Sequence, residues 1–375
     1  MINCGKFYKA LIDRKIEFFT GVPDSLLKDI CAYITDNTPK ERNIIAANEG
    51  GAIALASGYY LATGKMPLVY MQNSGQGNSI NPLASLTDKE VYSIPMLLMI
   101  GWRGEPGKED EPQHRKQGRI TLDLLKVLEI PYEILSDKSN GIEDYIDRAV
   151  THMKKKNSSY AFVVRKGTFE SYALKNDGEE RYKLTREEAI KLAAEKLDGR
   201  EVIISTTGMI SRELFEYRKG KNQNLGRDFL TVGSMGHASQ IALGIALSKP
   251  NREVYCFDGD GSVIMHLGSL AVIGEKKPRN FKHIVFNNGV HDSVGGQPTA
   301  GFSINIPEIA KACGYKETWS AETAEEAEEK IELLKKAEGP SLLEIKVRKG
   351  HRKNLSRPDK SPEENKNNFM NFLEE

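Results

Sequence analysis

Short apolar runs that end in turn residues recur along the whole chain. Strands of parallel sheets are covered on both faces, so they appear as continuous apolar runs rather than as alternating ones. Eight runs have this character, at residues 68–71, 96–100, 161–164, 202–205, 229–232, 254–257, 284–286 and 342–347. We expect each of them to be a buried parallel strand.

Segments of helical period lie between these runs. One early helix would bury a face made of Phe7, Leu11, Ile12 and Ile16. Two capping boxes predict helix starts, Thr185 with Glu188 and Thr323 with Glu326. Regular alternation of strand and helix predicts doubly wound α/β layers.

The alternation occurs twice, which predicts two domains at residues 1–166 and 184–349. The polar segment 167–183 between them, with turn residues Asn176, Asp177 and Gly178, is predicted to be a linker. Residues 350–375 are strongly polar and are expected to form a C-terminal arm with a short helix near Phe369 and Phe372.

Composition narrows the class of protein. The 53 basic and 52 acidic residues nearly cancel, which argues against a nucleic-acid-binding protein with clustered positive charge. No apolar run approaches the ~18 residues of a membrane span, and the N-terminus has no signal-peptide pattern. The four cysteines are widely spaced without a CxxC pair, so we expect a cytoplasmic protein without disulfides.

The strongest chemical signal is the turn Asp258-Gly259-Asp260-Gly261-Ser262, which directly follows the apolar run 254–257. A glycine-rich turn at a strand end frees backbone N–H groups for phosphate oxygens. Asp260 offers a hard oxygen ligand, and the amide of Asn288 follows the run 284–286. Carboxylate and amide oxygens suit Mg²⁺.

Gly259-Asp260-Gly261, with Asn287-Asn288 one helix and one strand later, resembles the signature of thiamine-diphosphate enzymes. The resemblance implies a pyrimidine-binding domain followed by a diphosphate-binding domain, both of this α/β fold. The chain departs from the larger decarboxylases of the family by lacking a middle domain, because the second α/β run begins soon after the first ends. It implies that Asp260 and Asn288 ligate Mg²⁺ by side chain and Val290 by its carbonyl. Gly261 and Ser262 would hold phosphate oxygens.

A second feature of the resemblance is Glu49, which follows an apolar run and precedes a helix of small residues. It matches the catalytic glutamate that shares a proton with N1′ of the aminopyrimidine. In the second domain, the Gly233 carbonyl would accept from N4′ and Met235 would wedge under the bent cofactor. Three further residues, Thr207, Gly208 and Met209, would lie along the cofactor beside the diphosphate.

The substrate is expected to meet loops of the first domain. Asp24 and Ser25 lie in a loop that matches the substrate loop of 2-oxo acid decarboxylases, and Asn73 and Gln76 follow the run 68–71. Proton transfers could use His114, His237, His291 or the cofactor itself, and His291 is also expected to border the substrate pocket. For an anionic substrate group, Arg103 is the first choice, with Lys108 and Arg115 next.

Over nearly its whole length the chain resembles the branch of this family that acts on 3-phosphonopyruvate or sulfopyruvate. The telling stretches are residues 19–28, 73–78, 102–105, 211–214, 355–358 and 364–366. A single chain favours 3-phosphonopyruvate, giving phosphonoacetaldehyde and CO₂, because sulfopyruvate decarboxylases are commonly split into two subunits. The alternatives are sulfopyruvate decarboxylation, an acetolactate-synthase-like carboligase, or a catalytically silent subunit.

The resemblance also implies partners. In thiamine enzymes the two domains that share one cofactor come from different subunits, so we expect a homodimer, or a dimer of dimers, with shared active sites. No nucleic-acid or membrane partner is expected.

Overall fold

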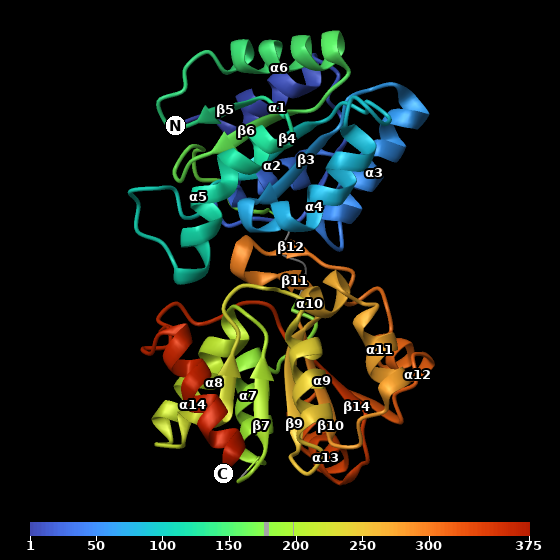
Figure 1. The fold of residues 1–375 in the computed structure, drawn as a ribbon, viewed down its shortest axis with the longest axis vertical. Helices are drawn as coiled ribbons and strands as arrows, with labels where there is room; N and C mark the ends of the chain where they lie inside the picture. Colours follow the sequence, from blue (N-terminus) through green and yellow to red (C-terminus); the bar gives the residue numbers. More distant parts are fainter. Residues whose placement is uncertain (176–179, 198) are drawn as a thin grey trace. The chain divides into compact units, whose positions relative to one another are not determined.

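The computed structural model describes residues 1–175, 180–197 and 199–375. The chain forms two compact units (Figure 1). Unit 1 comprises Met1–Asp177 with Val294–Gln297, and unit 2 comprises Gly178–Ser293 with Pro298–Glu375. The expected linker turn at Asn176, Asp177 and Gly178 lies outside the described residues.

Unit 1 is built around a six-stranded parallel sheet with the order β2-β1-β3-β4-β6-β5. The strands are β1 Phe19–Gly21, β2 Asn43–Ile45, β3 Leu68–Gln72, β4 Leu97–Gly101, β5 Tyr132–Leu135 and β6 Tyr160–Val164. The helices are α1 Cys4–Asp13, α2 Lys28–Asn37, α3 Glu49–Thr63, α4 Gln76–Pro82, α5 Pro112–Val127 and α6 Ile142–Lys156, with short turns η1 Lys40–Arg42, η2 Asn73–Gly75 and η3 Leu83–Thr87.

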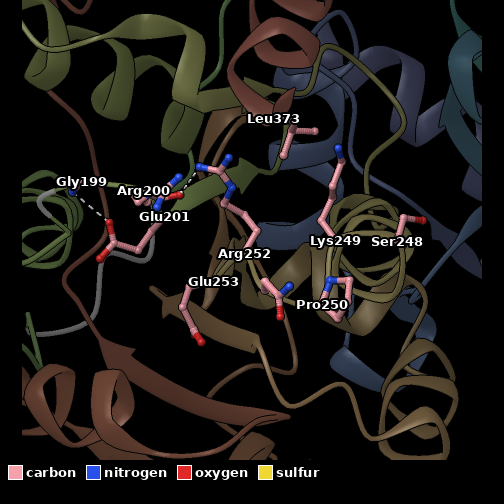
Figure 2. Close-up of a pocket in the computed structure, with 10 residues that line it drawn as sticks. Gly199, Arg200, Glu201, Ser248, Lys249, Pro250, Arg252, Glu253 and Leu373 are labelled. Atoms are coloured by element: carbon pink, nitrogen blue, oxygen red, sulfur yellow. Dashed lines mark hydrogen bonds between the residues drawn. The ribbon is translucent and has the colours of Figure 1, made fainter. Parts of the chain in front are cut away.

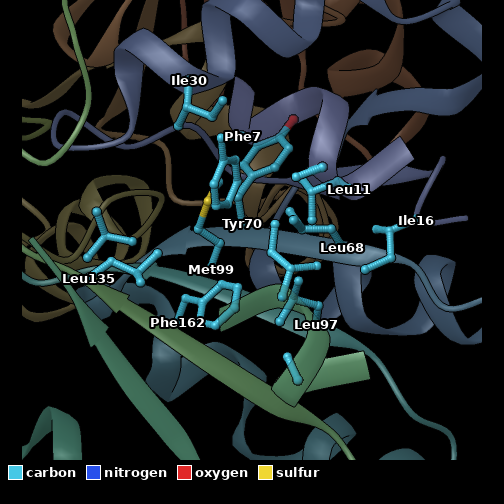
Figure 3. Packing of buried hydrophobic residues seen from close by; sticks show 14 of the residues in the cluster. Phe7, Leu11, Ile16, Ile30, Leu68, Tyr70, Leu97, Met99, Leu135 and Phe162 are labelled. Carbon is cyan, nitrogen blue, oxygen red and sulfur yellow. The ribbon is translucent and has the colours of Figure 1, made fainter. Parts of the chain in front are cut away.

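Both faces of this sheet are buried, as the apolar runs predict. Leu68 and Tyr70 of β3 pack in one cluster with residues of α1, α2 and α6, while Val69 and Met71 pack in the other with residues of α3 and α5. Figure 3 shows Phe7 and Leu11 of α1 near strand residues of the first cluster. Alternate strand residues therefore fill two separate cores, which confirms the doubly wound prediction.

Unit 2 repeats the architecture with the strand order β13-β14-β10-β9-β7-β8. Its strands are β7 Val202–Ser205, β8 Asp228–Leu230, β9 Val254–Gly259, β10 Phe281–Asn287, β13 Glu317–Ala321 and β14 Ser341–Lys346, and a separate small ladder joins β11 Val290–His291 to β12 Gln297–Pro298. Its helices are α7 Arg186–Glu195, α8 Met209–Gly220, α9 Ala238–Ser248, α10 Asp260–Met265, α11 Ser269–Lys276, α12 Ile306–Ala312, α13 Ala324–Lys336 and α14 Pro362–Glu374, with turns η4 Leu225–Arg227 and η5 Asp292–Val294. Two apolar clusters again cover the two faces of the sheet.

All eight apolar runs coincide with parallel strands. The run 229–232 was predicted two residues too long, because β8 ends at Leu230 and Val232 is exposed. The prediction missed β1, β2, β5 and β13, as well as the two-residue strands β11 and β12. β1 and β2 have only three residues each, and β5 and β13 are interrupted by polar residues and are not fully buried at most positions.

The predicted helix starts are present with one difference. Thr185 and Glu188 form a complete capping box. At α13 the Thr323 hydroxyl accepts from the Glu326 N–H at 3.2 Å, but the Glu326 carboxylate accepts from the Glu322 N–H at 2.8 Å rather than from Thr323. Half of the second capping box is therefore replaced by a contact one residue earlier. None of the described helices is long and apolar enough to cross a membrane.

The expected C-terminal helix is α14, and it packs along the edge strand β8. The Asn365 side chain accepts from the Leu230 N–H at 3.1 Å and donates to the Asp228 carbonyl at 3.0 Å. Phe369 of the same helix is buried in the apolar cluster. The helix thus satisfies backbone groups that an edge strand would otherwise expose.

Gly21 at the end of β1 provides a test of the packing in unit 1. A Cβ at Gly21 would lie 2.0 Å from the Tyr70 carbonyl oxygen, so Gly21→Ala must push β1 away from β3. We expect a loss of roughly 1–3 kcal/mol in unfolding free energy, typical of overpacking in a core, seen as a lower thermal-unfolding midpoint.

The matched control is Gly58→Ala in α3, where an added Cβ meets nothing within 4 Å. This change should leave the midpoint unchanged or raise it slightly, because alanine favours a helix by about 1 kcal/mol. A Gly21→Ala midpoint equal to that of wild type would contradict the packing described for β1 and β3.

Candidate active site

Asp260 lies at the centre of the candidate metal site in unit 2, directly after β9. Its side chain is 2% exposed, and its carboxylate accepts hydrogen bonds from the Asn288 N–H, at 3.3 Å, and from the Thr299 hydroxyl. Burial raises its pKa to about 6, and the groups that oppose this shift are the Thr299 hydroxyl and backbone amides rather than a basic side chain. Asp260 is therefore a buried acid whose charge lacks a cationic partner among the groups that act on it.

The asparagine pair lies at the same edge of the sheet, because Phe286 of β10 pairs with Gly259 of β9. Asn287 is fully buried and donates to the Gly301 carbonyl at 2.9 Å and to the Glu344 carboxylate at 2.7 Å. Both of its amide hydrogens are thus used within the fold. Asn288 is the member of the pair that remains for a ligand, although its oxygen accepts from the Val290 N–H at 3.2 Å.

This arrangement fits a hard divalent cation such as Mg²⁺. The Asp260 carboxylate, the Asn288 amide oxygen and the Val290 carbonyl are oxygen donors of the type that this ion takes, and its charge would compensate the buried carboxylate. They are the three ligands that the resemblance to thiamine-diphosphate enzymes implies, and their binding of the ion stays a prediction.

Two residues near Asp260 were missed by sequence reasoning. Thr299 donates to Asp260 across 39 positions of sequence. A Cβ at Gly301 would lie 2.5 Å from an Asp260 carboxylate oxygen and 2.6 Å from the Asn287 amide oxygen. Only glycine lets this loop approach both side chains, and no local motif around 299–301 signals it.

The candidate phosphate residues lie against Met235 and His291. A Cβ at Gly261 would be 3.0 Å from His291 Cε1 and 3.4 Å from Met235 Cε. The Ser262 hydroxyl is 2.9 Å from that of Thr206 and accepts from the Gly236 N–H at 3.1 Å. Because that hydroxyl is engaged within the fold, a phosphate contact by Ser262 would fall to its backbone amide. Burial lowers the pKa of His291 to about 4, so its imidazole is neutral near pH 7.

The loops after β7 and β8 adjoin each other. The Thr207 hydroxyl accepts from the Gly233 N–H at 3.0 Å. Gly208, before Met209 at the start of α8, has φ +104°, and Gly233 has φ +76°, both in the region that favours glycine. Loops from four neighbouring strands, β8, β7, β9 and β10, therefore carry the predicted residues at the carboxyl edge of one sheet, where open α/β sheets bind ligands.

Unit 1 holds the candidate catalytic acid. Glu49 is the first residue of α3 and is 5% exposed. Its carboxylate accepts from the Asn78 side chain at 2.8 Å. A Cβ at Gly75 would lie 2.1 Å from the other carboxylate oxygen. The sequence pattern identified the segment 73–78 but did not predict that Asn78 orients Glu49 or that Gly75 makes room for it.

Arg103 of unit 1 is joined to two of the predicted substrate residues. Its guanidinium donates to the Ser25 hydroxyl at 2.8 Å, and the Asn73 side chain donates to the Arg103 carbonyl at 2.8 Å. Asp110, which sequence reasoning missed, accepts from Nε at 2.8 Å and from Nη2. Asp110 also accepts from the Gly104 N–H at 2.7 Å.

Asp24, another predicted substrate residue of unit 1, lies in the interior. Asp24 is fully buried, and its carboxylate accepts from the Gln72 side chain at 2.6 Å and from the Leu26 N–H at 3.0 Å. Burial raises its pKa. In this conformation the Asp24 carboxylate is enclosed and holds the loop that carries Ser25. A direct contact between Asp24 and a substrate stays a prediction.

The remaining predicted residues of unit 1 lie in or near α5. Gln76 is buried and donates to the Thr121 carbonyl at 3.4 Å. His114 is buried, and both desolvation and the charge of Arg103 lower its pKa. Arg115 and Lys108 are exposed. His237 of unit 2 is exposed as well.

A cavity of about 630 Å³ lies at the opposite end of the unit 2 sheet (Figure 2). Its lining includes Arg252 and Glu253, which precede β9, whereas the Gly-Asp-Gly turn begins at the far end of that strand. Six residues of strand separate the two by about 20 Å. Arg252 and Lys249 of the cavity contact α14, at the Phe372 carbonyl and at Glu374, so they stabilise the helix rather than the candidate site.

A buried group of possible metal ligands lies on β9 and β10, just before the Gly-Asp-Gly turn. The ligand atoms of Cys256, Asp258 and His283 all lie within 4.8 Å of one another. Burial raises the pKa of the Cys256 thiol well above its ordinary value, which favours the protonated form over the thiolate that binds metals. The group is therefore best described as polar core packing beneath the Gly-Asp-Gly turn.

Comparisons with known proteins match both units. Residues 6–126 match the model of the thiamine pyrophosphate enzyme N-terminal TPP binding domain, and residues 206–345 match that of the C-terminal TPP binding domain. Phosphonopyruvate decarboxylases from Streptomyces viridochromogenes and Streptomyces hygroscopicus are 32% and 31% identical, each over 100% of this chain and 95% of the relative. A sulfopyruvate decarboxylase from Methanosarcina acetivorans is 26% identical over 98% of this chain and 97% of its own.

The last relative corrects one step of the sequence argument. A single chain was expected to favour 3-phosphonopyruvate over sulfopyruvate. Because a sulfopyruvate decarboxylase aligns with this chain over nearly the full length of both proteins, chain length does not discriminate between the two substrates.

The raised pKa of Asp260 predicts a pH effect in metal-free protein. An acid whose pKa rises from about 3.9 unfolded to about 6 folded contributes stability below pH ~4, which is lost as the pH rises to about 6. Asp260→Asn should therefore raise the unfolding midpoint of the metal-free protein at pH ~7.5 and change it much less at pH ~4.5.

Adding Mg²⁺ with thiamine diphosphate should stabilise the wild type and not the Asn variant, measured by calorimetric scanning. Asp123→Asn, on a well-exposed side chain, serves as the control and should show neither effect. A lower midpoint for metal-free Asp260→Asn at pH ~7.5 would contradict the description of Asp260 as an uncompensated buried acid.

Proposed function

The chain belongs to the thiamine-pyrophosphate-dependent 2-oxo acid decarboxylases, and we propose that its substrate is 3-phosphonopyruvate, which it converts to phosphonoacetaldehyde and CO₂. The observation that carries the substrate proposal is Arg103, fixed beside Ser25 at the end of β4. The two Streptomyces relatives, each a phosphonopyruvate decarboxylase aligned over the whole chain, support it.

Thiamine diphosphate, when bound, supplies a thiazolium ring that takes up the electron pair left by the departing CO₂. In this chain Asp260, Asn288 and Val290 would hold the Mg²⁺ that neutralises the diphosphate. Gly261 and the backbone of Ser262 would bind phosphate oxygens.

Glu49 would share a proton with the aminopyrimidine nitrogen N1′. Its low exposure keeps competing water away, and the hydrogen bond from Asn78 fixes the orientation of its carboxylate. A carboxylate that is held in place loses little conformational freedom when it receives the ring.

We propose a homodimer in which Glu49 of one subunit and Asp260 of the other serve the same cofactor. The presence of both residues in one chain, each in its own thiamine-binding unit, supports this arrangement. A two-fold axis would then produce two equivalent sites, and a dimer of dimers would repeat them.

The substrate carries a carboxylate, a keto group and a phosphonate. The Arg103 guanidinium suits the phosphonate, because its planar donors match two oxygens at once. Since their pKa values are lowered, His114 and His291 are neutral near pH 7 and can each donate one N–H to the substrate. Sulfopyruvate is the second candidate, favoured by the full-length Methanosarcina relative, and it would present a sulfonate to the same arginine.

Glu49→Gln tests the proposed catalytic acid. Glutamine keeps the shape but cannot share a proton in the same way, so CO₂ release should fall by at least ~100-fold while calorimetry still detects binding of thiamine diphosphate with Mg²⁺. Glu143→Gln, a first-turn glutamate of α6, is the control and should keep normal turnover. Near-normal CO₂ release by Glu49→Gln would rule out this role.

The substrate is tested by the rate of CO₂ release from phosphonopyruvate, sulfopyruvate and pyruvate, with thiamine diphosphate and Mg²⁺ present. We expect the highest kcat/KM for phosphonopyruvate, by about tenfold or more over pyruvate, because pyruvate lacks the anionic group at C3. A higher kcat/KM for sulfopyruvate would replace the proposed substrate with the second candidate.

A further inference from the structure

Arg103 is held at every polar part of the residue. The Asn73 side chain accepts from its backbone N–H at 3.1 Å and donates to its carbonyl at 2.8 Å. Asp110 accepts from Nε at 2.8 Å and from Nη2, and the Ser25 hydroxyl accepts from Nη1 at 2.8 Å. An arginine at a binding site is often free to change rotamer, but these contacts fix the rotamer of Arg103.

Asp110 is fixed in its turn by the loop around it. Besides Arg103, it accepts from the N–H groups of Gly104 and Glu111, at 2.7 and 2.8 Å. Burial alone would raise its pKa, but the hydrogen bonds from Arg103 and these two amides outweigh burial and hold the pKa well below its ordinary value. The ion pair is therefore formed throughout the range in which the protein would work.

The loop between Arg103 and Asp110 is packed tightly onto α5. A Cβ at Gly118 would lie 1.7 Å from the Gly104 carbonyl oxygen, and a Cβ at Gly104 would lie 2.0 Å from the His114 carbonyl oxygen. The Trp102 ring donates to the Gly118 carbonyl at 2.8 Å. These contacts set the position of the carboxylate relative to the guanidinium.

The guanidinium retains donors for a ligand despite these partners. Of its five N–H groups, Asp110 takes one on Nε and one on Nη2, and Ser25 takes one on Nη1. One hydrogen remains on each terminal nitrogen, and the side chain is 20% exposed. These two remaining donors, one on each terminal nitrogen, can bind two oxygens of one phosphonate.

We propose that Asp110 is a positioning residue for substrate specificity: it orients Arg103 so that the two remaining N–H groups bind an anionic group at C3 of the 2-oxo acid. This inference rests on the proposed function and extends it by naming the residue that makes the arginine selective. A substrate without that anion gains nothing from the arrangement, so Asp110 separates phosphonopyruvate from pyruvate.

A purely neutralising role for Asp110 predicts the opposite change in substrate binding when the carboxylate is removed. If the carboxylate only neutralised Arg103, its removal would release a full positive charge and tighten binding of a dianion. If it positions Arg103, its removal loosens the guanidinium and weakens binding, because an unfixed side chain must be ordered again by the ligand.

The experiment is a double-mutant cycle on the full enzyme loaded with thiamine diphosphate and Mg²⁺. Asp110→Asn should raise KM for phosphonopyruvate by about tenfold, with kcat and the KM for pyruvate changed by less than about threefold. In an Arg103→Gln background the same change should have little further effect, because Asp110 acts through Arg103. Binding of the unreactive 3-phosphonopropionate, measured by calorimetry, should follow the same pattern.

Asp147→Asn is the matched control, since Asp147 forms the same two-pronged pair with Arg14 elsewhere in unit 1, with both contacts at 2.6 Å. It should change neither KM nor binding. An unchanged or lower KM for phosphonopyruvate in Asp110→Asn, or equal effects of that change with and without Arg103, would overturn the inference. If wild-type enzyme released no CO₂ from phosphonopyruvate, the proposed function would fail, while 3-phosphonopropionate binding would still decide the role of Asp110.

Discussion

The candidate metal site of the second unit is built around one constraint: the Asp260 carboxylate is buried without a basic partner. Asp260 is surrounded by a hydroxyl and backbone amides, which lower the cost of its charge but do not compensate it. The neighbouring groups hold Asp260 in this position. Gly301 makes room for its carboxylate, and Asn287 links the Gly301 carbonyl to Glu344. The fold thus maintains an unfavourable site that a divalent cation can make favourable, which couples metal binding to the stability of the unit.

In the first unit the charged groups have partners. Hydrogen bonds fix Glu49 and Arg103 in place but leave part of each side chain available for a ligand. Glu49 receives one hydrogen bond from Asn78, and Arg103 gives three to Ser25 and Asp110. In both cases the partner is a short side chain from another segment of the same unit, which limits the rotamers of the functional residue. One unit therefore supplies an unsatisfied charge and the other supplies oriented ones.

The sequence was most informative where chemistry and backbone coincide. Strands such as β3 and β9 are apolar on both faces, and the Gly-Asp-Gly turn directly follows a strand, so both could be predicted locally. Thr299 and Asp110 could not, because their roles arise from contacts that only the folded loops create. The case of Asp24 shows the same limit: its motif predicts a substrate contact, but packing against Gly101, where a Cβ would lie 1.9 Å away, encloses it. Strands such as β2 were missed because three residues are too short to stand out as a strand in the sequence.

The docking of α14 on β8 has a practical consequence for handling the protein. The final turns of this helix are tied to the body of unit 2, with Lys249 bound to Glu374 and Arg200 to the Glu375 carbonyl. Truncating the chain before Pro362, or appending a bulky affinity tag directly to Glu375, would uncover or disturb a strand edge able to recruit other chains. A tag for crystallisation or immobilisation is therefore better placed before Met1, which is exposed.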